Sequence, residues 1–402
     1  MRQKIAFVSH TYMEPATRTK LVCMAEHAEV RLIAPAAYPT PYGWRALDTS
    51  GNDNLEIQSY PIRFLHLERT STRWLLISRD LGFSEFQPEI IHVENELHSW
   101  ITSQVLLYRR LFAPSAKVVA FKWDNIAAEG QGTKARLLER LAIRNANRID
   151  LLISGNRAGR DILLAQGVPA EKVKVLPQWG IDPELFYPFF PEQRRACRDQ
   201  LRISDSDFAI GFMGRLVEEK GILDLVRATA KVPWVATKAP TLVLVGAGGS
   251  ENAARSLCRE LGVNLVVAPP CSYLDVPKFM NALDVFVLPS QSRPFWREQF
   301  GHVLIEAMAC GVPVIGSNSG EIPNVILDAG LVFPEREVAS LAECITLCGD
   351  EIFRAKLRAR GLEHVLKNYT NQKIADYTLK LYQQVSGTSL KETRFSPKVL
   401  AL

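Results

Sequence analysis

Short apolar runs alternate with longer amphipathic stretches along the whole chain. Runs rich in β-branched and aromatic residues include KIAFVSH, KVVAFKW and FAIGFMG, and they read as buried strands. Between such runs, ARLLERLAIRNANR and KGILDLVRATAKV repeat apolar residues with the spacing of a helix face. Strands that are apolar throughout and separated by helices are typical of parallel sheets covered on both faces. The pattern therefore predicts an α/β protein with doubly wound sheets.

The strand predictions fall into two groups separated by a break. The first group lies at 4–10, 29–35, 89–93, 117–123, 151–155 and 172–178, and the second at 208–214, 241–248, 265–270, 285–290 and 312–317. Between the groups, FYPFFPEQRR interrupts both the strand and the helix period with aromatic residues and prolines. The chain is therefore expected to form two domains with a cleft between them.

We predict the following domain boundaries from this break. Residues 1–188 form an N-terminal Rossmann-like domain, residues 189–200 a linker, and residues 201–370 a C-terminal Rossmann-like domain. Residues 371–402 contain a C-terminal helix that crosses back, followed by a tail. In sheets of this kind ligands bind beyond the carboxyl ends of the strands, so motifs at strand ends are the ones to search for chemistry.

Composition is consistent with this architecture. The chain has 402 residues, of which 47% are hydrophobic and 23% are charged, and two domains of about 200 residues are expected from that length. The first apolar run is too short for a signal peptide, and no run approaches the roughly 18 apolar residues of a membrane span. Its seven cysteines include no CxxC pair. We expect a protein made and used in a reducing cytoplasm.

Basic residues outnumber acidic ones between residues 105 and 149. The acids are Asp124, Glu129 and Glu139, and the bases are Arg109, Arg110, Lys117, Lys122, Lys134, Arg136, Arg140, Arg144 and Arg148. Such a run is typical of a solvated helix face, and it also suits anionic lipid head groups or an anionic acceptor. The second interpretation would place the protein peripherally at the inner face of the plasma membrane. No nucleic-acid motif accompanies the run, so nucleic acid is not an expected partner.

A glycine and two cations follow the first strand of the second domain. In FMGRLVEEKGILDL, Gly214 permits a turn, and Arg215 and Lys220 stand near the start of a helix. Backbone amides, the helix dipole and these two charges all favour a diphosphate. The alternative is that both cations pair with Glu218 and Glu219 on the surface.

The stretch EQFGHVLIE combines two acids with the start of a helix. Glu298 lies in the preceding loop, Gly301 opens the helix, and Glu306 lies one turn in. The amides of Phe300, Gly301 and His302 are donors at the positive end of the helix dipole. Carboxylates accept hydrogen bonds from hydroxyl groups, and amides hold negative oxygens, so the combination suits a sugar nucleotide. Upstream, the Pro-Pro corner near Cys271 could edge a planar base.

The order of these motifs resembles that of the retaining glycosyltransferases of family 4, which have the two-domain GT-B fold. The resemblance covers most of the chain and is carried by VLPQWGIDPELFYP, FMGRLVEEKG, LDVFVLPS, EQFGHVLIEAMACGVPVIGS and GEIPNVI with the following AGLVF. It implies an acceptor-side N-terminal domain and a C-terminal domain that binds a nucleotide sugar.

The resemblance also implies residue roles. Arg215 and Lys220 would hold the donor diphosphate and stabilise the leaving nucleotide, Glu306 would accept the ribose hydroxyls, and Glu298 would contact the donor sugar. The backbone near Cys271 would read the base. Sugar hydroxyls or phosphate oxygens would be held by the amides of Phe300, Gly301 and His302. A phosphate oxygen of the donor accepts the proton in the family, so no carboxylate base is required; nucleophilic attack by Glu298 is the alternative.

The N-terminal domain departs from the family pattern at two places. Members often carry a Gly-Gly loop after the first strand, whereas SHTYMEPATRTKL contains no glycine; Thr17, Arg18 and Lys20 are candidates to replace its contacts. Many members place a histidine near the transferring sugar, whereas VVAFKWDNI has Lys122 there. Lys122 is therefore a candidate catalytic residue, which would contact a donor carboxylate, a phosphate or the acceptor, or else point to solvent.

A DxD sequence raises the question of a metal ion. Asp205 and Asp207 form this pattern, but they precede a strand instead of following one, and we interpret them as a solvated turn. Because Arg215 and Lys220 supply positive charge at the diphosphate, the activity is expected to be independent of metal and cofactor.

These observations predict a retaining glycosyltransferase that moves a hexosyl group from a nucleotide-diphosphate sugar, with a UDP-sugar, and UDP-glucose first, as donor. The expected acceptor is a glycan or lipid-linked glycan in bacterial polysaccharide biosynthesis. Two alternatives stay open: a nucleotide-sugar-binding subunit without catalysis, and another GT-B enzyme such as a sugar-nucleotide epimerase. Nucleotide release from a panel of nucleotide sugars would separate them.

Overall fold

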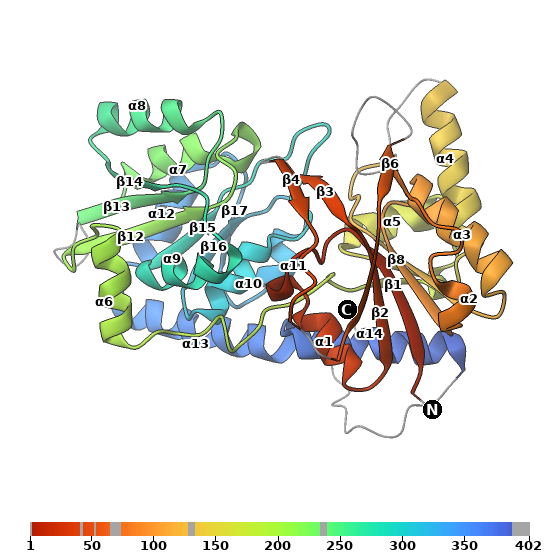
Figure 1. The fold of residues 1–402 in the computed structure, drawn as a ribbon. Helices are drawn as coiled ribbons and strands as arrows, with labels where there is room; N and C mark the ends of the chain where they lie inside the picture. Colours follow the sequence, from red (N-terminus) through yellow and green to blue (C-terminus); the bar gives the residue numbers. More distant parts are fainter. Residues whose placement is uncertain are drawn as a thin grey trace. The chain divides into compact units, whose positions relative to one another are not determined.

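A computed structural model describes residues 2–40, 43–51, 54–64, 74–127, 133–233 and 239–387 (Figure 1). The predicted tail after residue 387 and the side chain of Lys134 lie outside the described residues. The chain divides into two compact units. The first contains the residues up to Gly180 and those from Asn371 on, and the second runs from Ile181 to Thr370.

The first unit is built on a parallel seven-stranded sheet with the order β11-β10-β9-β8-β1-β2-β5. Its strands are β1 (Lys4–Ser9), β2 (Glu29–Pro35), β5 (Glu56–Tyr60), β8 (Ile90–Glu94), β9 (Lys117–Lys122), β10 (Leu151–Ser154) and β11 (Val173–Val175). Two antiparallel pairs are added by β3 (Ala37–Thr40) with β4 (Gly43–Ala46) and by β6 (Ile62–Phe64) with β7 (Trp74–Leu76). Its helices are α1 (Thr19–Ala25), α2 (Phe83–Phe86), α3 (Trp100–Phe112), α4 (Thr133–Ala146), α5 (Arg157–Ala165) and α14 (Asn371–Ser386).

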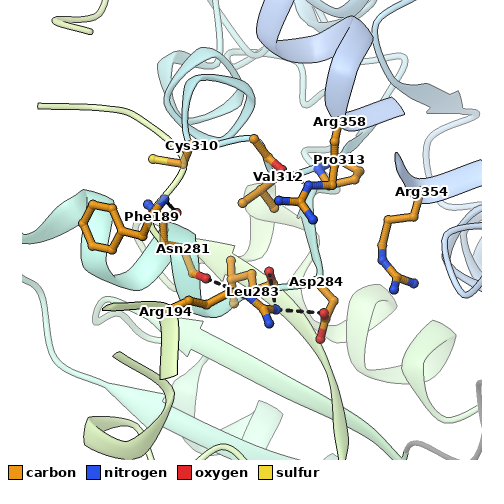
Figure 2. Close-up of a pocket in the computed structure, with 11 residues that line it drawn as sticks. Phe189, Arg194, Asn281, Leu283, Asp284, Cys310, Val312, Pro313, Arg354 and Arg358 are labelled. Carbon is orange, nitrogen blue, oxygen red and sulfur yellow. Dashed lines mark hydrogen bonds and ion pairs between the residues drawn. The ribbon is translucent and has the colours of Figure 1, made fainter. Parts of the chain in front are cut away.

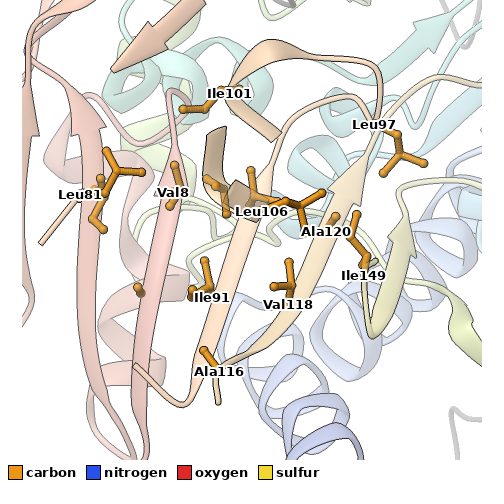
Figure 3. Close-up of a cluster of buried hydrophobic side chains, with 14 of the residues drawn as sticks. Val8, Leu81, Ile91, Leu97, Ile101, Leu106, Ala116, Val118, Ala120 and Ile149 are labelled. Atoms are coloured by element: carbon orange, nitrogen blue, oxygen red, sulfur yellow. The ribbon is translucent and has the colours of Figure 1, made fainter. Parts of the chain in front are cut away.

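Alternate residues of the central strands in this sheet enter two different cores. Ile5 and Phe7 of β1 pack in the cluster that includes residues of α1 and α14. Ala6 and Val8 pack in the cluster that includes Ile101 of α3 (Figure 3). Burial on both faces explains why these strands read as continuous apolar runs.

The second unit contains a parallel six-stranded sheet with the order β14-β13-β12-β15-β16-β17. Its strands are β12 (Asp207–Met213), β13 (Ala239–Val245), β14 (Asn264–Ala268), β15 (Val285–Leu288), β16 (Val314–Ser317) and β17 (Leu331–Phe333). Its helices are α6 (Pro191–Gln200), α7 (Ile222–Thr229), α8 (Glu251–Leu261), α9 (Val276–Ala282), α10 (His302–Ala309), α11 (Ile322–Ile326), α12 (Val338–Leu347) and α13 (Glu351–Asn368).

The predicted fold class is confirmed, because both units are doubly wound α/β structures. All eleven predicted strands occur, as β1, β2, β8 to β16. Residues 191–200, which we expected in a linker, form α6 instead, which packs against α9. Gln193 accepts a hydrogen bond from the backbone N–H of Phe190 at 3.0 Å, and buried Arg198 contacts Asp284 at 3.3 Å, so this segment belongs to the second unit.

Each sheet has one point at which the strand order reverses. In the first sheet this point lies between β1 and β8, and in the second it lies between β12 and β15. At such a switch point the connections leave in opposite directions and open a crevice beyond the carboxyl ends of the strands, where ligands bind. The loops after β1, β8, β12 and β15 are therefore the places to look for a site.

Candidate functional site

The loop after β12 reaches the loop after β15 through a glycine. The 3-10 turn at Glu218–Lys220 ends at Gly221, whose φ is +69°. A Cβ atom at Gly221 would lie 1.9 Å from the carbonyl oxygen of Pro289 at the end of β15. A side chain cannot occupy that position, so glycine permits the close approach that brings Lys220 beside the second loop.

Lys220 and Glu298 form an ion pair at this switch point. The Lys220 Nζ donates to the Glu298 Oε2 at 2.5 Å, and it lies 4.8 Å from the centre of the Trp296 ring. Only 15% of the Lys220 side chain and 10% of the Glu298 side chain are exposed. Lys220 therefore pairs with Glu298, and not with Glu218 or Glu219 on the surface as in the alternative interpretation. Removing either partner of a largely buried pair leaves an uncompensated charge.

Arg215, in contrast, forms the surface ion pair with Glu219 that the sequence analysis gave as an alternative. Its guanidinium lies 3.3 Å from the Glu219 carboxylate, and 53% of the side chain is exposed. An exposed pair of this kind contributes little to stability. Arg215 therefore stands at the edge of the site with a weakly held side chain. Gly214 before it has a φ of +145° and donates its N–H to the Val245 carbonyl at 3.0 Å.

Glu298 is held in place by residues that the sequence analysis did not single out. The Ser290 hydroxyl donates to Glu298 Oε2 at 2.8 Å, and the Ser317 hydroxyl donates to the Ser290 carbonyl at 2.5 Å. A Cβ atom at Gly320, whose φ is +55°, would lie 1.9 Å from the Glu298 carbonyl oxygen. The signal for these contacts was the run of small residues after the strands, in LPS and GSNSG.

Glu306 is a buried acid on α10. Only 7% of the residue is exposed, and its carboxyl group makes no hydrogen bond or ion pair with any residue that the structure describes. Burial raises the pKa of Glu306 from 4.5 to about 7. A buried carboxyl group without a partner is costly, and a donor from a ligand would relieve that cost.

The Pro-Pro corner near Cys271 lies close to Glu306. Burial raises the pKa of the Cys271 thiol, and the charges of Asp275 and Glu306 raise it further. Burial also raises the pKa of Tyr273, again with a contribution from Glu306. Cys271 and Tyr273 therefore lie within electrostatic reach of Glu306.

The start of α10 combines a glycine with two rings. Gly301 has a φ of +82°, and among the described residues no side chain caps the helix there. The rings of Phe300 and His302 lie 4.8 Å apart, and burial lowers the pKa of His302 to about 3. His302 is therefore neutral at physiological pH and adds no charge to the helix start.

Of the two DxD acids, Asp205 lies in a turn and Asp207 is the first residue of β12. Asp205 pairs with Arg195 at 3.4 Å, and Asp207 accepts a hydrogen bond from the Ser204 N–H at 2.8 Å. In the part of the chain that the structure describes, no group of His, Cys, Asp and Glu side chains is arranged to hold a metal ion.

A small cavity lies at the opposite edge of the second sheet. Its volume is about 30 Å³, and Asp284 and Pro313, which precede β15 and β16, are among its lining residues together with Arg194 and Arg358 (Figure 2). The volume is close to that of one water molecule, so this cavity does not hold a sugar nucleotide.

In the first unit, the glycine-free loop turns its cations inward. The Arg18 guanidinium donates to the backbone carbonyls of Tyr12, Met13 and Asp48. The Lys20 Nζ donates to the Gln178 carbonyl at 2.6 Å and lies 3.7 Å from the Glu94 carboxylate. Both side chains are thus used to hold the loop, which gives no support to the idea that they replace phosphate contacts.

Lys122 lies at the carboxyl end of β9, at the same edge of the first sheet as the loop after β1. Only 7% of the residue is exposed. It makes no hydrogen bond or ion pair with a residue in the described ranges. The structure places Lys122 in the first unit, and Lys220, Glu298, Cys271 and Glu306 in the second.

Two family models match the chain, one for each unit. The model "Glycosyl transferase 4-like domain" matches residues 13–179, and "Glycosyl transferases group 1" matches residues 193–364. Together with the doubly wound sheets, these matches define the protein as a GT-B type. The chain belongs to the glycosyltransferases of the family 4 type.

Solved structures agree on the fold. HepE of Anabaena in complex with UDP superposes with a TM-score of 0.69 at 19% identity, covering 95% of this chain and 100% of that one. Sucrose-phosphate synthase of Thermosynechococcus elongatus superposes with a TM-score of 0.69 at 21% identity, covering 96% of this chain and 100% of that one.

Curated relatives add sequence similarity over part of the chain. A GDP-mannose-dependent monoacylated alpha-(1-6)-phosphatidylinositol monomannoside mannosyltransferase of Corynebacterium glutamicum is 35% identical over 46% of this chain and 50% of its own length. A D-inositol 3-phosphate glycosyltransferase of Mycobacterium tuberculosis is 27% identical over 72% of this chain and 61% of its own length. The matches therefore span half to three fifths of these relatives.

Proposed function

We propose that the protein is a retaining glycosyltransferase that moves a hexosyl group from a nucleotide-diphosphate sugar to a glycan or lipid-linked glycan. The observation that carries this proposal is the buried carboxyl group of Glu306, which lacks a partner among the described residues and lies near Cys271. A ribose supplies the hydroxyl donors that such an acid needs, next to a base at the corner after β14. Bacterial polysaccharide biosynthesis is the proposed setting.

The reaction follows from the charges at the switch point. Lys220 and Arg215 would hold the diphosphate, and their positive charge would stabilise the nucleotide as it leaves. The Glu298 carboxylate would accept hydrogen bonds from the donor sugar. Lys220 is already paired with Glu298, so the diphosphate would share this cation with the acid that orients the sugar.

The chemistry proposed here requires no carboxylate base. The acceptor hydroxyl would attack on the face from which the nucleotide leaves, and its proton would pass to a donor phosphate oxygen. We propose no nucleophilic attack by Glu298, because its Oε2 already accepts hydrogen bonds from both Lys220 and Ser290. We propose that the activity is independent of metal ions.

UDP-glucose is the first proposed donor, and a GDP-sugar is the second. The family's commonest donor supports the first, and the printed name of the Corynebacterium relative, which depends on GDP-mannose, supports the second. Isothermal titration of UDP and GDP would separate them. Binding of neither diphosphate would overturn the proposal as a whole.

We also propose a peripheral contact with anionic membranes through α3 and α4. Trp100, Leu107 and Leu111 on α3 are 45%, 53% and 59% exposed, and Leu137 on α4 is 67% exposed. The exposed arginines beside them are Arg110, Arg136, Arg140 and Arg144. Apolar side chains next to arginines suit the boundary between acyl chains and anionic head groups. No helix within the described ranges is long and apolar enough to cross a membrane.

A further inference from the structure

Three arginines line the small cavity at the amino ends of β15 and β16 (Figure 2). Arg194 comes from α6, and Arg354 and Arg358 come from α13. Among the described residues that line this cavity, Asp284 is the only acid. All of these residues belong to the second unit, so the cavity is formed within one compact body. The cavity therefore gathers positive charge.

The carboxylate of Asp284 is already paired with cations. Its Oδ1 lies 2.9 Å from a guanidinium nitrogen of Arg194, and its Oδ2 lies 3.3 Å from one of Arg198. Asp284 is 8% exposed and Arg198 is 1% exposed, so this pairing is largely buried. By contrast, Arg354 and Arg358 form no ion pair with a carboxylate in the described ranges. Two of the lining charges thus have no acid of their own.

The carboxyl ends of helices supply the other negative charge near these arginines. Carbonyl groups at the ends of α9, α10 and α12 accept hydrogen bonds from Arg198, Arg358 and Arg354 at 2.9, 2.8 and 2.8 Å; they belong to Ala282, Gly311 and Cys348. A helix end carries about half a negative charge. Three such ends together with Asp284 leave roughly one and a half of the four positive charges unbalanced.

The lining arginines repel one another. Arg354 and Arg358 lie one turn apart on α13, and like charges at this spacing destabilise a helix. Burial lowers the pKa of Arg358, and the charges of Arg194 and Arg354 lower it further against a smaller opposing effect of Asp284. The three guanidinium groups are therefore within electrostatic reach of one another, and an anion between them would relieve the repulsion.

The same arginines keep N–H groups that could bind an ion. The Nη atoms of Arg358, and the Nε and Nη2 atoms of Arg354, donate to no residue that the structure describes. These nitrogen atoms are not among the buried atoms without partners, and Arg358 is exposed, so a dissolved ion can reach them. Guanidinium groups form strong, charge-assisted hydrogen bonds with anions.

We propose that Arg194, Arg354 and Arg358 bind one small inorganic anion in this cavity, and that the bound anion stabilises the second unit. The volume of about 30 Å³ admits a single compact ion and excludes a sugar or a nucleotide. Chloride and phosphate both accept guanidinium hydrogen bonds and are the two candidates. The inference does not rest on the proposed function, because the cavity lies at the opposite edge of the second sheet from Lys220 and Glu298.

Urea unfolding at constant ionic strength tests the inference. Sodium gluconate is the reference salt, because gluconate is larger than the cavity, and it is replaced stepwise by sodium chloride or sodium phosphate. We expect the unfolding midpoint to rise with anion concentration, because the ion binds the folded chain and not the unfolded one. The anion that raises the midpoint at the lower concentration is the preferred ligand.

Variants locate the ion and remove the general effect of phosphate on protein stability. Arg358→Met should need about ten- to a hundredfold more anion for the same rise, the scale of one charge-assisted hydrogen bond, and Arg354→Met is an independent second variant with the same expectation. Arg360→Met is the matched control, because Arg360 is exposed on the same helix and does not line the cavity. Lys220→Ala should keep the wild-type rise, which separates this cavity from the proposed diphosphate site.

Three outcomes would overturn the inference. They are no rise above that in gluconate, an equal rise in the wild type and in both lining variants, and loss of the rise in Lys220→Ala. The last outcome would place the anion at the switch point of the second sheet. Failure to bind any nucleotide would contradict the proposed function and leave the anion site standing.

Discussion

At the scale of one residue, burial changes the protonation of Glu306. Glu306 lies on α10 with 7% of its surface exposed. Its pKa is raised to about 7, because the charged carboxylate loses water on burial and gains no hydrogen-bond partner among the described residues. The unfolded chain releases this proton near the ordinary pKa of 4.5. Stability therefore falls as pH rises between these values, because the folded protein binds the extra proton.

The first prediction follows from this difference. Glu306→Gln should become more stable relative to the wild type as pH rises from about 4.5 to about 7, by up to about 3 kcal/mol. Urea unfolding at several pH values measures the difference. Exposed Glu343→Gln on α12 is the control and should show no such trend. A stability difference that is constant across this range would contradict the buried, protonated state of Glu306.

The second prediction concerns the role proposed for the same acid. Glu306→Ala should weaken binding of UDP or GDP without any sugar attached, roughly ten- to a hundredfold, because a carboxylate bound to ribose hydroxyls is lost. Titration calorimetry measures this affinity. Unchanged affinity for the sugar-free nucleotide would refute the ribose contact even if transfer were lost.

The third prediction separates Lys220 from an ordinary surface cation. Lys220→Ala should reduce transfer by about 2–4 kcal/mol, the cost of losing one charge that stabilises the leaving group. Lys278→Ala is the control, since Lys278 is 54% exposed and pairs with Asp275 at 2.7 Å. Arg215→Ala should fall in the range of Lys220→Ala if its side chain leaves Glu219 to bind the diphosphate. Turnover equal to the wild type in both site variants would exclude the diphosphate assignment.

At the scale of elements, strands that bury their side chains can be predicted from the sequence, whereas strands that bury few side chains are missed. The eleven predicted strands are apolar runs packed in the cores of the two sheets. The missed ones are short or polar: β5 reads EIQSY, pairs with β2 at the sheet edge and has no fully buried residue. Such a strand is held by backbone hydrogen bonds and buries few side chains. Its sequence therefore does not show the alternation of apolar and polar residues by which strands are predicted.

Helix α14 illustrates a contact between elements that no local pattern reveals. Its Tyr382 is fully buried, and the Tyr382 hydroxyl is hydrogen-bonded to His92 Nδ1 in β8. His92 in turn stacks on Phe7 with ring centres 4.3 Å apart. The sequence separation of 290 residues places this bond outside any motif.

The fourth prediction tests that contact. Tyr382→Phe should lower the free energy of unfolding by about 1–3 kcal/mol, because a buried ring nitrogen of His92 loses its partner. Tyr377→Phe on the same helix is the control, since its hydroxyl makes no hydrogen bond with a described residue. Equal stability of the two variants would show that the hydroxyl of Tyr382 adds nothing.

At the scale of the whole molecule, the sequence shows the order of the motifs but not the contacts that surround their residues. Lys220, Glu298 and Glu306 stand in recognisable order along the chain. Their environment depends on distant residues, such as Pro289 against Gly221 and Ser317 behind Ser290. Likewise, Asn95 belongs to no motif, and only the structure shows that its Nδ2 is buried without a hydrogen-bond partner among the described residues.

The fifth prediction concerns the surface of α3 and α4. The protein should bind vesicles that contain anionic lipid and release them as salt rises, because head-group attraction is screened. Replacing Arg136, Arg140 and Arg144 together by glutamine should abolish this binding, whereas the same change at Arg255 and Arg259 on α8 should not. Vesicle sedimentation measures it. Binding to neutral vesicles alone, or none, would contradict the proposed membrane contact.

The central claim, transfer from a nucleotide sugar, is tested most directly by one assay. The protein is incubated with UDP- and GDP-linked hexoses and with glycan acceptors. Both nucleotide release and glycosylated product are followed, with and without a chelator. We predict product with retained anomeric configuration, formed equally well in chelator. Nucleotide binding without release or product from any donor would contradict the claim and indicate a binding subunit instead.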